Sequence, residues 1–460
     1  MQTCRQEDKG GARADPAELN GDKMTVEVTQ PHQAMQRRTP RAVLLWAVTV
    51  GTAVALGLAI APVAADSGVQ QQDLFVDGPG PGLPIPSAAF GQHVANIART
   101  VPDARLTSIR LWDSGTRWDQ IETSPGRYNW GTLDAAVDNA QAAGAKNILY
   151  VLGSTPRWAA RNPGIPGLYG PGSTSLPRKT GDYVDFARKV AKRYKGRITG
   201  YQIWNEANTR SFYEGDWTAL ARLTRRTSEA IKVVDPKAEV VAASSTVIPG
   251  RLFQTESFFV RYARALHRLG DPVDAFSVHL YPVDTSKGPD ARTRAILATQ
   301  RVLNKVGIDR PVWDTEVNYG DRRAGLPQVV PDTQQAVTYV ARTYIDAATL
   351  GIARSYWYGW DLGVLGIDLT VAGRLTPAGR SFLTVRDWLV DARPAGCQNK
   401  AGLRVCRFTG TGGRPFAIVW SRSSNTTIGA KGLKVCRLDG GCSQGKGELT
   451  VDRQPVLLRP

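Results

Sequence analysis

The segments YQIWNEAN (residues 201–208) and PVWDTEVNY (residues 311–319) each place a glutamate directly after a run of apolar and aromatic residues. Short apolar runs of this kind are typical of buried strands. The glutamates are Glu206 and Glu316, and a carboxylate in such a place costs free energy unless it is paired or takes part in chemistry. They lie 110 residues apart (316 − 206), which leaves room for about three strand–helix units of a barrel.

Strand-like and helix-like patterns alternate from residue 88 to residue 391. Predicted strands, which are short and apolar, cover residues 88–93, 106–112, 147–152, 198–204, 239–243, 275–280, 311–315 and 353–357. Amphipathic helical patterns cover residues 132–144, 182–194, 217–234, 257–270, 291–307, 332–351 and 376–391. This alternation predicts an α/β fold, a (β/α)8 TIM barrel over residues 70–392. A doubly wound sheet is the alternative, but no G-x-G-x-x-G motif opens a helix after the first predicted strand.

Residues 395–460 have a different pattern, which predicts a small β-sandwich-like domain. Short β-rich runs alternate with Gly/Ser turns, and no helical period is present. Four of the five cysteines fall here, at Cys397, Cys406, Cys436 and Cys442. They allow three pairings, of which the local pairs Cys397–Cys406 and Cys436–Cys442 are favoured. A zinc site is disfavoured because CxxC spacing and a nearby histidine are both missing, so we expect no metal.

Residues 1–41 are a polar N-terminal segment, and residues 42–65 are an uncharged apolar run preceded by three arginines. The 24-residue run is long enough to anchor the chain in a membrane through residues 42–64. It also ends in Val-Ala-Ala, which a signal peptidase could cut, and a chain begun at Met35 would have the usual layout of a signal peptide. We therefore expect a secreted or membrane-anchored protein with the barrel outside the cytoplasm, in a compartment that permits disulfides.

The chain is strongly basic, with a formal net charge of +17 from 58 Lys and Arg residues against 41 Asp and Glu residues. Such a charge favours anionic surroundings, for example acidic glycans, a polyanionic cell wall or phosphate-rich surfaces. An arginine-rich composition from a high-GC genome would give the same charge without any such partner. The basic residues are scattered and no nucleic-acid motif is present, so we expect no nucleic-acid partner.

Residues at the carboxyl ends of barrel strands build the active site in this class of fold. Besides the two glutamates, the predicted strand ends and the loops after them carry His93, Arg110, Trp158, Asn205, His279, Tyr281, Trp357 and Trp360. Cleavage of a glycosidic bond needs two carboxyl groups across that bond, one to donate a proton and one to attack or to activate water. Arg110 either keeps Glu316 ionised or forms a structural ion pair with Asp113 or Asp314. Each tryptophan is either a core residue or a platform that stacks on a sugar.

This set of motifs resembles clan A of the glycoside hydrolases, and within the clan it is most similar to family 39, which includes β-xylosidases and α-L-iduronidases. The resemblance rests on SIRLWDSGTRWDQIE followed by GRYNWGTLD, on GYQIWNEAN, on VHLYP and on the attached β-domain. It implies that Glu206, in the Asn205-Glu206 pair after the fourth strand, is the acid/base. It also implies that Glu316, at the end of the seventh strand, is the nucleophile, and that His93 and His279 are the histidines of the first and sixth strands.

The resemblance implies a retaining glycoside hydrolase that cleaves O-glycosidic bonds of an extracellular or cell-wall glycan by double displacement. Its substrate would be an oligo- or polysaccharide, and no cofactor is needed. Glu206 would need a raised pKa, Glu316 would be ionised, and Asn205 would bond the sugar 2-hydroxyl. A transglycosylase on the same fold and a non-catalytic glycan-binding wall protein are the alternatives. The segment 153–178 departs from the xylosidase pattern, which leaves the sugar open.

Overall fold

The computed structural model describes residues 71–75, 82–246, 257–282, 288–325, 328–423 and 425–460. All the described residues belong to one compact unit, which spans residues 65–460. The predicted polar segment (1–41) and the apolar run (42–65) therefore lie outside the described residues. None of the helices in the described ranges is long and apolar enough to cross a membrane.

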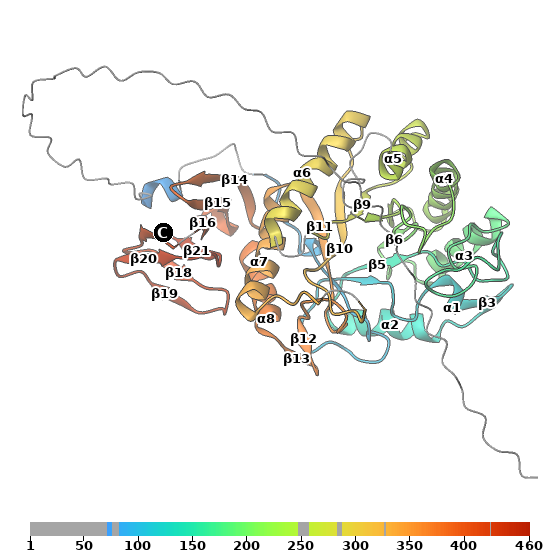
Figure 1. Cartoon of the computed structure of the whole chain (residues 1–460), viewed down its shortest axis with the longest axis horizontal. Helices are drawn as coiled ribbons and strands as arrows, with labels where there is room; N and C mark the ends of the chain where they lie inside the picture. The colour runs from blue at the N-terminus through green and yellow to red at the C-terminus, as the bar shows by residue number, and fades with distance from the viewer. Residues whose placement is uncertain (1–70, 76–81, 247–256, 283–287, 326–327, 424) are drawn as a thin grey trace, which may run out of the picture. The chain divides into compact units, whose positions relative to one another are not determined.

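Within the described ranges, nine parallel strands form one curled sheet in the order β7-β6-β5-β2-β1-β11-β10-β9-β8 (Figure 1). Their bounds are β1 (Phe90–His93), β2 (Ser108–Leu111), β5 (Asn147–Val151), β6 (Gly200–Gln202), β7 (Glu239–Val241), β8 (Ser245–Thr246), β9 (Phe276–His279), β10 (Val312–Val317) and β11 (Ile352–Tyr358). Strands β7 and β8 are two parts of one run of chain, and β8 pairs with β9. A parallel bridge between Val241 and Ala275 also joins β7 to the start of β9. The sheet thereby closes, which confirms the predicted (β/α)8 barrel.

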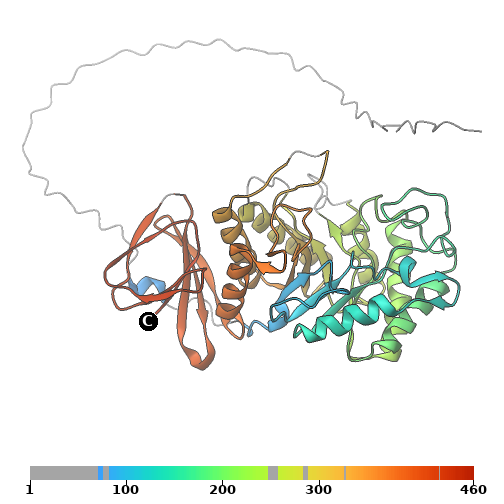
Figure 2. The same ribbon diagram turned by 90° about the horizontal axis from the view of Figure 1, so that it is seen from below.

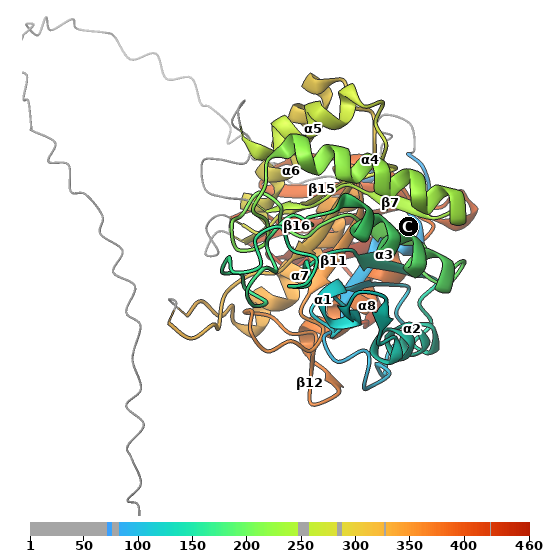
Figure 3. The same cartoon turned by 90° about the vertical axis from the view of Figure 1, so that its right-hand side faces the viewer.

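Helices follow the strands and lie outside the sheet (Figures 1 and 3). They are α1 (Trp118–Ile121), α2 (Gly131–Ala142), α3 (Thr180–Arg193), α4 (Trp217–Val234), α5 (Phe258–Arg268), α6 (Gly288–Val306), α7 (Thr333–Thr349) and α8 (Pro377–Leu389). Helix α5 illustrates how the sequence sets them, because Ser257 Oγ accepts a hydrogen bond from the Val260 N–H and caps its start. Its buried residues Phe259, Tyr262 and Leu266 then recur at the spacing of one helix face, which packs into the main core.

The barrel interior is filled by side chains of its own strands. One apolar cluster there consists of Leu149, Val241, Ala275, Trp313 and Tyr356. Gly91 on β1 pairs with Tyr356 on β11 and makes room for its ring, since a Cβ atom at residue 91 would lie 2.3 Å from the ring atom Cδ1. The interior is therefore a packed core, and the polar groups of the barrel gather at its ends.

The C-terminal strands form an antiparallel sheet in the order β14-β15-β16-β21-β18-β19, and β17 pairs separately with β20. These strands are the orange-to-red part of the ribbon at the left of Figure 2. Their bounds are β14 (Arg393–Lys400), β15 (Leu403–Thr409), β16 (Pro415–Ser421), β17 (Thr426–Gly429), β18 (Lys434–Cys436), β19 (Cys442–Gln444), β20 (Glu448–Val451) and β21 (Val456–Arg459). Two hairpins, β3 (Glu122–Ser124) with β4 (Arg127–Tyr128) and β12 (Thr370–Val371) with β13 (Arg374–Leu375), belong to the loops of the barrel. The predicted additional β-domain is thus present at the C-terminus.

Side chains on β15 alternate between two cores. Leu403 and Val405 pack with Leu74 of the short helix η1 (Gln71–Leu74), whereas Cys406 and Phe408 belong to the core that continues into the barrel. One face of the C-terminal sheet therefore packs against the barrel. Because residues 65–460 form one unit, the boundaries at 70–392 and 395–460 stay predictions.

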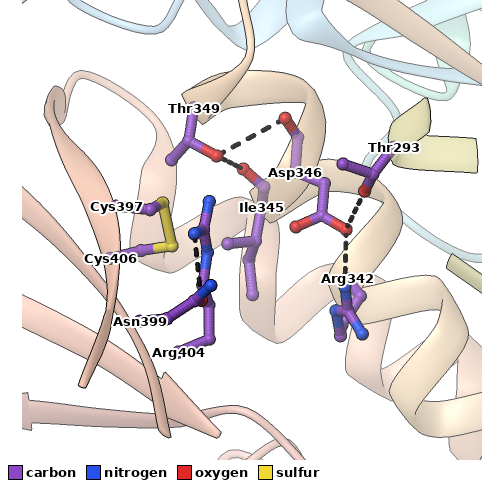
Figure 4. The surroundings of a disulfide bond; sticks show 9 residues. All are labelled: Thr293, Arg342, Ile345, Asp346, Thr349, Cys397, Asn399, Arg404 and Cys406. Carbon is purple, nitrogen blue, oxygen red and sulfur yellow. Dashed lines mark hydrogen bonds and ion pairs between the residues drawn. A yellow bond between two sulfur atoms is a disulfide. The ribbon is translucent and has the colours of Figure 1, made fainter. Parts of the chain in front are cut away.

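Both predicted disulfides are present. Cys397 is bonded to Cys406 and Cys436 to Cys442, and each pair faces its partner directly across two antiparallel strands. Local spacing predicted these pairs because each loop is short enough for the strands on either side to form a hairpin. The first disulfide links the two strands of the β14–β15 hairpin, which lies against helix α7 (Figure 4).

Substitution of Gly91 by Ala tests the packed interior. We expect Gly91→Ala to lower the free energy of unfolding by about 1–3 kcal/mol, because the new methyl group would overlap the Tyr356 ring. The matched control is Gly181→Ala in α3, where a Cβ atom meets nothing within 4 Å, and this change should be neutral or stabilise by up to about 1 kcal/mol. Urea unfolding followed by circular dichroism measures both, and equal stabilities of the two variants would contradict the packing.

Candidate active site

Four strands bring polar groups to the carboxyl end of the barrel. β2 carries Arg110, β9 ends at His279 and β10 carries Glu316, which lies opposite His279 in the register of the two strands. β6 leads into Asn205 and Glu206 three and four residues after its end. The topology of the barrel thus gathers these side chains although they are far apart in the sequence.

The backbone of Glu206 has a left-handed conformation, with φ of 42°. This conformation costs a residue other than glycine about 1–3 kcal/mol, and such residues cluster at functional sites. The Glu206 N–H donates to Ser244 Oγ at 2.9 Å, which helps to hold the turn. In this conformation the Glu206 side chain points toward His279, and Glu206 Oε1 lies 2.8 Å from His279 Nδ1.

Arg110 is a fully buried cation that ties three of these strand ends together. Its Nη1 donates to Glu316 Oε1 at 2.6 Å, its Nε to Gln202 Oε1 at 3.1 Å and its Nη2 to Asn205 Oδ1 at 2.7 Å. Among the described residues, Glu316 is the only carboxylate within 4.0 Å of this guanidinium group. Because arginine stays charged in proteins and a buried charge needs a counterion, this contact favours the ionised form of Glu316.

His279 lies between the two glutamates. Its Nδ1 is 2.8 Å from Glu206 Oε1 and 3.2 Å from Glu316 Oε2, and burial lowers its pKa to about 3, so the ring is neutral. Its Nε2 has no hydrogen-bond partner among the described residues. The tautomer with the proton on Nδ1 is favoured, since it avoids a buried N–H without an acceptor. Tyr281 adds a second donor to Glu316, from its hydroxyl to Oε2 at 3.1 Å.

The environments of the two glutamates differ in charge. Burial raises the pKa of Glu206 to about 7, and the charge of Arg110 opposes this rise only in part. Burial also raises the pKa of Glu316, but the charge of Arg110, which is in direct contact with its carboxylate, acts against that rise. The site therefore holds one carboxyl group that keeps its proton near neutral pH and one that is stabilised as an anion.

Glu206, His279 and Glu316 also offer a possible set of metal ligands, since one ligand atom from each lies within 4.8 Å of the others. However, Arg110 already neutralises Glu316, and Glu206 would have to lose its proton to act as a ligand. The three residues therefore suit proton transfer better than cation binding.

The predicted tryptophans differ in exposure, since Trp357 and Trp360 are covered by protein whereas Trp158 is partly exposed. Trp357 and Trp360 are 0% and 3% exposed, and the indole N–H of Trp357 donates to the Ile367 carbonyl. Trp158 is partly buried and donates to the Glu122 carbonyl. This burial argues against the predicted stacking on sugars, because no ring of Trp357 or Trp360 presents a free face.

His93 is also buried, and burial lowers its pKa to about 4. Its Nε2 contacts the Trp112 carbonyl, and its ring stacks on Tyr358 at 4.3 Å between centroids. Both of these contacts are with neighbouring groups of the protein. The alternative partners predicted for Arg110 are engaged elsewhere, since Asp314 pairs with Arg292 at 2.7 Å and Asp113 lies 3.9 Å from Arg117.

Asp113 is a residue of this region that the sequence did not single out as a site residue. It has a left-handed backbone with φ of 53°, and its carboxylate accepts hydrogen bonds from the hydroxyls of Tyr169 at 2.5 Å and Tyr358 at 2.7 Å. The signal available in the sequence was its position directly after the second predicted strand, next to Trp112. Its two tyrosine partners, one in a loop and one at the end of β11, are distant in the sequence and could not be read from a local pattern.

No protein-family model matches the chain, and no curated protein matches its sequence. Solved structures do match its fold. A family 39 glycoside hydrolase from the gut symbiont Bacteroides cellulosilyticus WH2 has a TM-score of 0.62 at 18% identity, over 81% of each chain. A GH30 endoxylanase from Clostridium papyrosolvens C71 has a TM-score of 0.56 at 13% identity, over 84% of this chain and 97% of the other.

A family 44 xyloglucanase from Paenibacillus polymyxa has a TM-score of 0.53 at 12% identity, over 84% of this chain and 98% of the other. Likeness at such low identity concerns the fold. The predicted resemblance is therefore confirmed for the fold, which is similar to those of glycoside hydrolases of families 39, 30 and 44.

The raised pKa of Glu206 predicts a specific pH dependence of stability. The folded chain holds this proton up to a pH of about 7, whereas the unfolded chain loses it near its ordinary value of 4.5. The stabilisation is therefore complete below pH 4.5 and is lost as the pH rises to about 7. The variant Glu206→Gln lacks this titrating group. Between pH 4.5 and pH 7, the free energy of unfolding of the original protein should therefore fall by about 3 kcal/mol more than that of the variant. Urea unfolding at both pH values measures the difference, and parallel pH profiles would contradict the assignment.

Proposed function

We propose that the chain is a retaining glycoside hydrolase in which Glu206 is the acid/base and Glu316 is the nucleophile. The observation that carries the proposal is the asymmetry of the two carboxyl groups, since Glu316 is paired with buried Arg110 while burial raises the pKa of Glu206 to about 7. The ligand atoms of both groups lie within 4.8 Å of each other, which favours the short carboxyl separation of retaining enzymes, about 5 Å, over the longer one of inverting enzymes. The names of the structures with a similar fold support the same class of reaction.

In the first step, the Glu206 carboxyl group gives its proton to the glycosidic oxygen while a Glu316 carboxylate oxygen attacks the anomeric carbon. The bond from that carbon to the leaving group breaks, and a glycosyl ester forms on Glu316. Asn205 assists this step with the NH2 group of its side-chain amide. Its Oδ1 is held by Arg110, so its NH2 group is the part left to donate to the sugar 2-hydroxyl.

In the second step, Glu206 acts as a base. Formation of the ester removes the negative charge of Glu316, which favours the ionised form of Glu206. The Glu206 carboxylate takes a proton from water, the water oxygen attacks the anomeric carbon, and the ester bond to Glu316 breaks. Two inversions give a product with the configuration of the substrate.

Transglycosylation would follow the same path with a sugar hydroxyl in place of water, so product analysis with an added acceptor separates the two reactions. A non-catalytic glycan-binding protein is the weaker alternative. It would need neither a buried arginine that keeps one glutamate ionised nor a second glutamate whose pKa is raised to about 7.

We also propose that this part of the chain works outside the cytoplasm. The two disulfides support this location, since such bonds persist in oxidising compartments. Residues 42–65, the predicted signal or anchor, lie outside the described residues.

Replacement of each glutamate tests the two roles. Glu316→Gln should abolish turnover of every aryl glycoside in a chromogenic panel, because no glycosyl ester can form. Glu206→Ala should keep the first step on substrates with good leaving groups and lose about 10²–10⁴-fold in overall turnover. Azide should restore that turnover and give a glycosyl azide of retained configuration, which nuclear magnetic resonance identifies.

The matched control is Glu229→Gln, an exposed glutamate paired with Arg225 on α4, which should leave turnover unchanged. Azide rescue of Glu316→Ala with an inverted product, together with inactive Glu206→Ala, would exchange the two assignments. Full activity of Glu316→Gln would overturn the proposed mechanism.

Export is tested by fractionation of expressing cells and by sequencing the N-terminus of the recovered protein. We expect the mature chain either to begin near Asp66 or to stay in the membrane fraction through residues 42–64. Recovery of the full-length chain in the soluble cytoplasmic fraction would contradict both forms of this proposal.

A further inference from the structure

A cavity of about 700 Å³ lies on the outer side of the barrel, where helices α6 and α7 meet the C-terminal sheet. Its lining includes Arg294 on α6, Arg342 on α7 and Trp420 on β16, and none of its lining residues belongs to the site of Glu206 and Glu316. Its volume lies within the usual range of small-molecule sites. The cavity is therefore a separate candidate site.

The lining carries an excess of positive charge. It includes five arginines, Arg294, Arg342, Arg404, Arg422 and Arg453, against two carboxylates, Asp290 and Asp346. Both carboxylates pair with a single arginine, Arg342, at 2.8 and 3.1 Å. In the described part of the chain, none of the other four arginines has a carboxylate within 4.0 Å.

Arg404 shows the effect of this excess. Burial lowers its pKa, and the charges of Arg342 and Arg422 lower it further, although Asp346 acts in the opposite direction. Its Nη1 donates to a neutral acceptor, Asn399 Oδ1, at 3.1 Å. A partly buried guanidinium group among like charges is stabilised when an anion binds beside it.

The walls of the cavity are held in place by the fold. Cys397 and Cys406 are directly opposite on the β14–β15 hairpin, and Asn399 and Arg404 are opposite each other two residues further along, on the same face (Figure 4). The disulfide thus fixes the strand pair that presents Arg404. On the opposite wall, the guanidinium group of Arg342 lies 4.9 Å from the ring of Trp420, and its Nε has no hydrogen-bond partner among the described residues.

We propose that this cavity binds an acidic sugar residue, a uronate, of a glycan chain. Arginine binds carboxylates through paired N–H donors, and the cavity is much larger than a single inorganic anion. The partly buried ring of Tyr339 and the side chain of Leu297 add apolar surface, which suits the C–H face of a sugar ring. The net charge of +17 favours attraction of a polyanionic chain to the protein. Binding here does not require the proposed hydrolase activity.

The test is calorimetric titration of the full chain with trigalacturonate and with a neutral trisaccharide. Arg422 and Arg453 are exposed, so Arg422→Gln/Arg453→Gln should fold normally. Loss of two charge-assisted contacts should weaken trigalacturonate binding at least about tenfold. Neutral trisaccharide binding and turnover of small aryl glycosides should not change. The matched control is Arg222→Gln/Arg226→Gln on α4, which removes the same charge from another surface and should change affinity less than about twofold.

Unchanged trigalacturonate affinity in Arg422→Gln/Arg453→Gln would overturn the proposal, as would an equal loss in the control, which would indicate a non-specific effect of net charge. Binding of inorganic phosphate or sulfate as tight as that of trigalacturonate, at equal ionic strength, would replace the uronate site by a site for small anions. A second variant, Arg404→Gln, should weaken trigalacturonate binding while the neutral trisaccharide binds as before.

Discussion

A single buried cation organises the candidate active site. Arg110 is fully buried, and its guanidinium group donates to three acceptors, on Glu316, Gln202 and Asn205. Because these acceptors come from β6, β10 and the loop after β6, the same group that neutralises the charge also fixes the distances between strand ends. Removal of one partner from a buried pair commonly costs about 3–5 kcal/mol, since a charge is left uncompensated. Folding of the barrel and arrangement of the site are therefore not independent.

This arrangement also separates the two charges carried by β10. Asp314 pairs with Arg292 of α6, and Glu316 pairs with Arg110 of β2. Each carboxylate has its own arginine, so neither competes for the other's partner. Glu206 has no arginine within 4.0 Å among the described residues, and burial therefore determines its protonation. Two chemically identical side chains thus have surroundings that favour different protonation states.

The barrel and the two glutamates could be predicted from the sequence because both depend on local order. Alternating strands and helices specify the barrel, and a glutamate just after a buried strand must then lie at its carboxyl end. The roles of Trp357 and Trp360 could not be predicted in this way, since the covering of their rings depends on segments that fold over them later in the chain. The hydrogen bonds of Asp113 with two tyrosines could likewise not be predicted, because one of them joins residues that are 245 positions apart. Local sequence patterns show at the end of which strand a residue lies, but they do not show which loop covers its side chain.

The barrel and the C-terminal strands share one apolar core next to β15, and neither part can therefore be removed without exposing it. Cys406 and Phe408 are buried in the same apolar cluster as Phe382 of α8, so the C-terminal strands cover a face of the barrel that water would otherwise reach. A barrel produced without these strands would expose that apolar face and would be prone to aggregate. The two parts should accordingly melt in one cooperative transition. Any shortened form of this chain made for study would have to keep both parts.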